Sequence, residues 1–142
     1  MNSPPKHENN LQLLTQQFAA LAAFQCLTFH ANEFGDGLNI LRIWQKWREI
    51  RPENNSRLHI IARTKQLLAS EELAQQLVKF SDLNDLVNLF LTQYPPAISG
   101  VHRLIFDEER LTMDLWFGDV VDDLKTPDTS IAITPIQTIA QT

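Results

Sequence analysis

Hydrophobic residues recur every three or four positions in four stretches of the chain, which is the spacing of one face of an amphipathic helix. The second stretch starts after Gly37 and is stopped by Pro52, because proline cannot continue a regular helix. Ser70 is the predicted N-cap of the third, with Glu71 and Glu72 in the first turn, where the helix dipole favours negative charge. The four predicted helices cover residues 11–24, 38–51, 70–80 and 83–91.

Four shorter hydrophobic stretches have the length of strands. CLTFHA (26–31) and RLHIIA (57–62) are nearly continuous, as in parallel strands that are buried on both faces. VHRLIF (101–106) and LTMDLWF (111–117) flank four polar residues, which predicts a β-hairpin. A strand, a glycine turn and a helix, followed by another strand and helix, indicate an α/β fold. We expect three parallel strands with helices, plus the hairpin.

The composition fits one globular domain, since the chain has 142 residues, of which 44% are hydrophobic and 20% charged. We assign residues 10–124 to this domain, with a disordered arm at 1–9 and a disordered or loose edge segment at 125–142. No apolar run of membrane-spanning length and no signal-like N-terminal segment occur, which predicts a cytoplasmic protein without membrane contact. The single cysteine, Cys26, predicts no disulfide, and no Cys/His spacing indicates a metal site.

The turn at residues 32–37 follows the first predicted strand, at the edge where ligands bind in open α/β sheets. A nucleotide loop has glycines there because its backbone approaches the ligand closely and adopts positive φ. Gly35 and Gly37 meet this requirement, whereas Glu33 adds bulk and negative charge at the remaining position. We interpret the turn as a nucleotide loop that is altered at Glu33.

Two acidic positions would complete a nucleotide site of this kind. A carboxylate after the second strand would accept hydrogen bonds from both ribose hydroxyls, but Thr64 and Lys65 stand there. An acid after the third parallel strand would lie near the adenine, and Asp119 meets that requirement. Five other residues are interpreted as packing rather than catalytic residues: His30, His59, His102, Trp44 and Trp47.

Three motifs together resemble a known family: FGDGLNILRIWQKWRE, the RLHII strand, and the block that runs from SGVHRL to DLWFGD. They are similar to the N-terminal methyltransferase domain of the bifunctional tRNA 5-methylaminomethyl-2-thiouridine biosynthesis proteins, over residues 29–121. That family joins an S-adenosylmethionine-dependent methyltransferase to an FAD-dependent oxidoreductase and modifies the wobble uridine of certain tRNAs. The resemblance implies a partial Rossmann-like methyltransferase fold, S-adenosylmethionine as cofactor and tRNA as partner.

The departures from the family pattern fall in the cofactor site. The family loop has the pattern acid-x-Gly-Phe-Gly-Thr-Gly-Leu-Asn. In this chain Ala31 stands in place of the acid, Glu33 in place of the first glycine and Asp36 in place of the threonine. After the second strand, Thr64 stands in place of the carboxylate that binds the ribose. No loop of the family's Asp-Gly-Phe-x-Pro type and no FAD site are expected in this chain. The resemblance implies this cofactor-binding set, with no catalytic residue assigned: Glu33, Phe34, Gly35, Asp36, Gly37, Asn39, Thr64, Lys65 and Asp119.

The net charge of −5 disfavours general binding to nucleic acid, but the charge is unevenly distributed. Between Arg42 and Lys65, seven basic residues against two acids give +5, so the remainder carries −10. This asymmetry predicts a tRNA-facing patch, with a solvated helix face as the alternative. The seven basic residues are Arg42, Lys46, Arg48, Arg51, Arg57, Arg63 and Lys65.

Three functions remain open at this point. The first is a divergent S-adenosylmethionine-dependent tRNA-modifying domain with weakened or lost catalysis. The second is a non-catalytic tRNA- or protein-binding module that retains the fold. In that case the first strand, at the end of a three-stranded parallel order, would leave an open edge for a partner chain or for self-association. The third is a truncated gene product.

Overall fold

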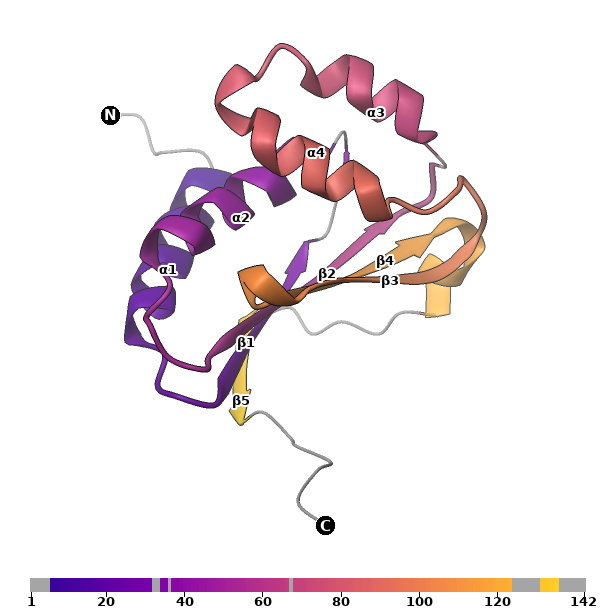
Figure 1. Ribbon diagram of the computed structural model, residues 1–142. Coiled ribbons are helices and arrows are strands. Elements are labelled where there is room, and N and C mark those ends of the chain that lie inside the picture. Colours follow the sequence, from indigo (N-terminus) through magenta and orange to yellow (C-terminus); the bar gives the residue numbers. More distant parts are fainter. Residues whose placement is uncertain (1–5, 32–33, 36, 67, 124–130, 136–142) are drawn as a thin grey trace, which may run out of the picture.

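The computed structural model describes residues 6–31, 34–35, 37–66, 68–123 and 131–135 (Figure 1). Within these residues, the helices are α1 (Lys6–Ala20), α2 (Leu38–Ile50), α3 (Ser70–Leu77) and α4 (Asn84–Gln93). The strands are β1 (Gln25–Ala31), β2 (Arg57–Thr64), β3 (Gly100–Phe106), β4 (Leu111–Phe117) and β5 (Ile131–Pro135). Three short 3-10 helices are also described: η1 (Ser81–Leu83), η2 (Asp107–Glu109) and η3 (Gly118–Asp123).

The five strands form one sheet in the order β3-β4-β2-β1-β5. Its centre is parallel, because β2 pairs in parallel with both β1 and β4. The edge strands are antiparallel: β3 forms a hairpin with β4, and β5 pairs with β1. The predicted α/β fold with three parallel strands, helices and a hairpin is confirmed, and it is a partial Rossmann-like fold.

The outer edge of β1 is paired, so the prediction of an open edge at this strand was wrong. Residues 131–135 form β5 and run antiparallel to β1, with Cys26 opposite Thr134 and Phe29 opposite Ile131. This strand lies in the segment predicted to be disordered or a loose edge. Its Thr/Ile/Pro composition carries no clear period, and only pairing with β1 makes it a strand.

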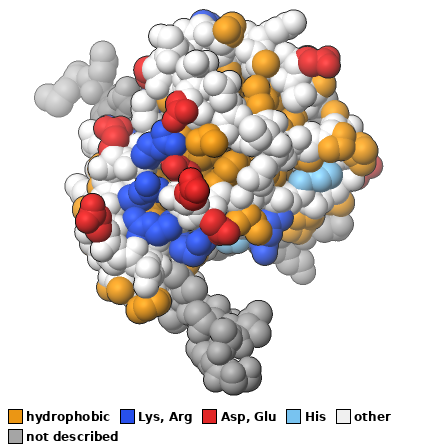
Figure 2. Space-filling view, in the orientation of Figure 1, with side chains coloured by type: hydrophobic (Ala, Val, Ile, Leu, Met, Phe, Trp, Pro, Cys, Tyr) orange, Lys and Arg blue, Asp and Glu red, His pale blue; other side chains and the backbone are white. Residues whose placement is uncertain are grey.

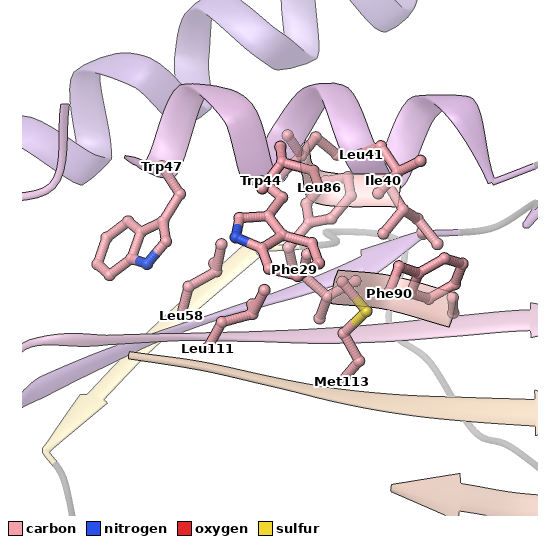
Figure 3. Close-up of a cluster of buried hydrophobic side chains, with 14 of the residues drawn as sticks. Phe29, Ile40, Leu41, Trp44, Trp47, Leu58, Leu86, Phe90, Leu111 and Met113 are labelled. Atoms are coloured by element: carbon pink, nitrogen blue, oxygen red, sulfur yellow. The ribbon is translucent and has the colours of Figure 1, made fainter. Parts of the chain in front are cut away.

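All four helices lie on one side of the sheet (Figure 1). Alternate residues of each central strand point into that side and are buried, as in β2, where Leu58, Ile60 and Ala62 are at most 1% exposed. Figure 3 shows α2 above the strands, with Trp44 and Leu41 pointing toward them. The interpretation of Trp44 and Trp47 as packing residues agrees with their burial, since both are 0% exposed.

Several helix boundaries differ from the predicted ones. The first helix begins at Lys6 and ends at Ala20, so residues 6–9 of the predicted arm are helical. Ser70 is the first residue of α3 rather than its N-cap, which is Ala69, and no side chain caps that helix end. Hydrophobic spacing locates a helix but leaves its ends uncertain by a few residues.

Candidate nucleotide-binding site

A cavity of about 380 Å³ lies at the carboxyl ends of β1 and β2. It brings together the glycine turn after β1, the residues that follow β2, and η3 after β4. The residues that line it are Phe34, Gly35, Arg63, Thr64, Lys65, Gln66 and Val121. Open α/β sheets bind nucleotides at the carboxyl ends of their parallel strands, so the cavity lies at the predicted place.

The cavity includes only part of the predicted cofactor set. Phe34, Gly35, Thr64 and Lys65 line it, whereas Asn39 and Asp119 are exposed side chains outside its lining. Glu33 and Asp36 lie outside the described residues. Sequence reasoning did not assign Gln66 and Val121 to the site. Gln66 could have been found, because it directly follows Lys65.

Phe34 fixes the turn to the fold. Its backbone N–H donates a hydrogen bond of 3.0 Å to the carbonyl of Arg63, and its own carbonyl accepts one of 2.9 Å from Gly37. Its ring is 1% exposed and packs among Phe90, Tyr94 and Phe117, with centroids 6.2 to 6.3 Å away. The aromatic residue in the middle of the turn is therefore an anchor, which leaves its backbone to shape the cavity.

Both described glycines of the turn have positive φ, 57° at Gly35 and 83° at Gly37. A Cβ on Gly35 would meet nothing within 4 Å, whereas one on Gly37 would lie 3.5 Å from the Phe34 ring. A Cβ would clash with no atom at either position, so it is the left-handed backbone conformation that favours glycine here. Gly37 also accepts the first bond of α2, from the N–H of Leu41 at 3.1 Å.

Thr64 provides a hydroxyl where a ribose-binding site has a carboxylate. Its Oγ1 accepts a hydrogen bond of 3.1 Å from the backbone N–H of Gln66. A carboxylate offers two acceptor oxygens to the two ribose hydroxyls, which a threonine cannot match. None of the cavity-lining residues in the described part of the chain is acidic. The lining therefore suits a nucleotide only in part.

The end of β4 is held close to the segment before β3. Gly118 has φ of 76°, and a Cβ there would lie 2.5 Å from Ser99 Oγ and 2.8 Å from Ser99 Cβ. Ser99 Oγ donates a hydrogen bond of 3.1 Å to the carbonyl of Phe117. Gly118 thus permits the close approach that positions η3, and with it Val121, beside the cavity.

The predicted basic patch is compensated by acids from other elements. Figure 2 shows Lys and Arg side chains gathered on one face with Asp and Glu among them. Arg42 pairs with Asp82, Arg48 with Asp85 and Glu109, Arg51 with Glu109, and Arg57 with Asp107. Four of the seven predicted tRNA contacts therefore have a carboxylate partner. Arg63 and Lys65 line the cavity.

Glu109 is the most extensively bound of these acids. Burial favours its neutral form, but hydrogen bonds from Arg48 and Trp44 prevail and lower the pKa of Glu109 below its usual value. The carboxylate therefore remains charged within the contact between α2 and the hairpin loop.

A second ionic cluster joins β2, β4 and β3 on the side of the sheet opposite the helices. Asp114 Oδ1 accepts a hydrogen bond of 2.7 Å from Arg103, and Asp114 Oδ2 lies 2.9 Å from Arg103 and 2.8 Å from Nε2 of His59. Burial opposes the charge of Asp114, yet these two partners lower its pKa well below the usual range. On the other side of the sheet, the His102 ring packs at a tilt against Phe117, with centroids 5.2 Å apart, as its interpretation as a packing residue predicted.

Two other kinds of site have no counterpart in the described residues. No group of three or more His, Cys, Asp or Glu side chains could hold a metal ion there. Over the same part of the chain, no helix is long and apolar enough to cross a membrane.

The sheet order and the cavity at its carboxyl edge define a partial Rossmann-like α/β domain with a candidate nucleotide site. The chain is a domain related to the tRNA 5-methylaminomethyl-2-thiouridine biosynthesis bifunctional proteins MnmC, as the resemblance predicted. It is 41% identical to the MnmC of Acinetobacter baylyi over 109 residues, which is 77% of this chain and 18% of the relative. No protein-family model matches the chain.

Other bacterial MnmC proteins show the same relationship. The chain is 38% identical to that of Psychrobacter cryohalolentis over 127 residues, which is 84% of this chain and 18% of the relative. It is 33% identical to that of Idiomarina loihiensis over 107 residues, which is 75% of this chain and 18% of the relative. The matched region thus spans less than a fifth of the length of these relatives.

Proposed function

We propose that the chain is a divergent domain of the S-adenosylmethionine-dependent tRNA methyltransferase type. It would act in wobble-uridine modification, with weakened or lost catalysis. The observation that carries this proposal is the cavity at the ends of β1 and β2, in a chain 41% identical to part of an MnmC protein. A role in tRNA modification would place the protein in the cytoplasm. The globular unit would comprise residues 10–124 together with β5.

The composition of the cavity lining supports weakened cofactor binding. Losing one hydrogen-bonded partner of a ligand hydroxyl costs about 1–3 kcal/mol. Thr64 stands in place of the ribose carboxylate, and Glu33 replaces a glycine of the loop. If the two changes cost this much each, binding would weaken by roughly thirtyfold to twenty-thousandfold, since each 1.4 kcal/mol is about a factor of ten.

A titration of the purified chain with S-adenosylmethionine tests this proposal, by calorimetry and by thermal shift. We expect dissociation constants in the millimolar range for the wild type and tighter binding for Glu33→Gly combined with Thr64→Glu. Thr92→Glu, an exposed position on α4, is the control for the added charge. No recovery in the double variant would mean that the cavity is not a degraded cofactor site.

A non-catalytic binding module is the second candidate, and the sheet face on which none of the described helices lies favours it. Such a module would show no S-adenosylmethionine binding even in the repaired variant, yet would retain cooperative unfolding. A truncated gene product without independent structure would lack that cooperativity.

A further inference from the structure

One face of the parallel sheet has no helix among the described residues. Because the helices lie on one side, the alternate residues of β2, β4 and β3 point to the other. Parallel sheets are almost always covered on both faces. We call this side of the sheet the open face. Strands β2, β3 and β4 contribute these residues to it: Arg57, His59, Ile61, Arg63, Val101, Arg103, Ile105, Thr112, Asp114 and Trp116.

The centre of the open face is electrostatically satisfied. Both carboxylate oxygens of Asp114 have partners, Arg103 and His59, and the Asp114 side chain is only 11% exposed. Arg57 pairs with Asp107 at 3.4 Å. A carboxylate with its hydrogen bonds made can be covered by protein far more easily than an unpaired one. A phosphate backbone needs a surplus of positive charge, and these internal pairs reduce that surplus.

The open face also carries four apolar side chains, of which Val101 and Ile105 are exposed and Ile61 and Trp116 are half-buried. Val101 and Ile105 on β3 are 50% and 47% exposed. Trp116 lies directly opposite Val101 across the β3–β4 pair, and Ile61 lies opposite Asp114 across the β2–β4 pair. Apolar side chains therefore lie on both sides of the Arg103–Asp114 pair along the strands.

The edges of the sheet offer no comparable site. On β1, the outer edge is paired with β5. On β3, the Gln93 side chain bonds both backbone groups of Ile105, donating to its carbonyl at 2.6 Å and accepting from its N–H at 2.9 Å. These contacts make both edges poorer templates for another strand, which favours binding of a partner to the face.

We propose that the open face binds a polypeptide layer of amphipathic helices, with an apolar stripe over Val101, Ile105 and Trp116. The source is the part of an MnmC-type protein outside the matched region, which makes up about four-fifths of those relatives' length. The proposal rests on the relationship to MnmC and not on cofactor binding. Failure of the S-adenosylmethionine titration would leave it standing.

Co-expression of the chain with the remainder of an MnmC protein tests this proposal. The tagged full chain is co-expressed with the Acinetobacter baylyi MnmC polypeptide from which the 109 matched residues are deleted, and the complex is quantified after affinity and size-exclusion chromatography. Ile105→Lys and Val101→Lys should each lower the recovered complex at least about tenfold. Lysine is tolerated on edge strands, and thermal unfolding checks that each variant folds. Val78→Lys, at the C-cap of α3 and on another surface, is a control at an exposed valine (75% exposed) and should leave recovery unchanged.

Three outcomes would overturn the proposal. One is no complex with the wild type, and another is a complex that the two face variants do not weaken. The third is evidence that another molecule occupies the face. This would be either a dimer of the chain in sedimentation or binding of fluorescein-labelled single-stranded RNA in anisotropy. In each case, the association would be lost in Ile105→Lys and retained in Val78→Lys.

Discussion

The indole nitrogen of Trp44 donates a hydrogen bond of 2.9 Å to Oε1 of Glu109, which joins α2 to the loop of the β3–β4 hairpin. Arg48 Nε donates to the same oxygen at 2.9 Å. The backbone carbonyl of Glu109 accepts bonds of 2.7 Å from both Trp47 and Arg51. One residue of a short polar loop thus ties the hairpin to the helix that follows the glycine turn.

Glu109→Ala should lower the free energy of unfolding by about 1–3 kcal/mol, because it leaves the Trp44 and Arg48 donors without this acceptor. Urea denaturation followed by tryptophan fluorescence measures the change. Glu108→Ala, at the neighbouring exposed residue, should change stability by less than about 0.5 kcal/mol. Equal losses in both variants would show that the loop, and not this bond, matters.

Asp114 should make stability depend on pH in the acid range. Its folded-state pKa is depressed despite burial, because Arg103 and His59 bind the carboxylate. The contribution of this group is therefore fully present above its unfolded-state pKa of about 3.9 and is lost as pH falls through the lower folded-state pKa. Urea midpoints measured from pH 6 down to pH 2 should fall less steeply for Asp114→Asn than for the wild type. Parallel curves would contradict this assignment.

Gly118→Ala should destabilise the chain more than Gly35→Ala. Both glycines have positive φ, which costs a residue with a Cβ about 1–2 kcal/mol. Only at Gly118 does the added Cβ also approach Ser99, to 2.5 Å from Oγ. Thermal unfolding should show the difference, and Ser99→Gly should restore part of the loss in Gly118→Ala. The absence of any coupling between the two sites would argue against the close approach.

Position on the fold should separate the predicted tRNA contacts into two groups. Arg42→Gln should leave tRNA affinity unchanged, because Arg42 already pairs with Asp82. Lys65→Glu, at the cavity, should weaken it and reduce the slope of affinity against salt by about one phosphate contact or more. Fluorescence anisotropy with labelled tRNA at several salt concentrations measures both, with Lys79→Glu near the end of α3 as control. A larger effect of Arg42→Gln would reverse this order.

The elements of the fold follow from local patterns. Continuous apolar runs identified β1 and β2, the polar tetrapeptide before Leu111 identified the hairpin, and helical spacing identified four helices. These signals are local because burial of one face dictates which positions are apolar. The helix ends and the cap at Ser70 were less accurate, since they depend on backbone hydrogen bonds that spacing does not report.

For the candidate site too, some features follow from the sequence and others only from the tertiary structure. The sequence alone determined the class of fold, the position of the glycine turn and the relationship to MnmC, because these depend on residue order and type. Only the tertiary structure decided that β5 closes the edge of β1 and that Asp82, Asp85, Asp107 and Glu109 pair with most of the basic residues. It also decided that the described helices all lie on one side of the sheet. Each of these depends on contacts between residues far apart in the chain, for which the local pattern carries no signal.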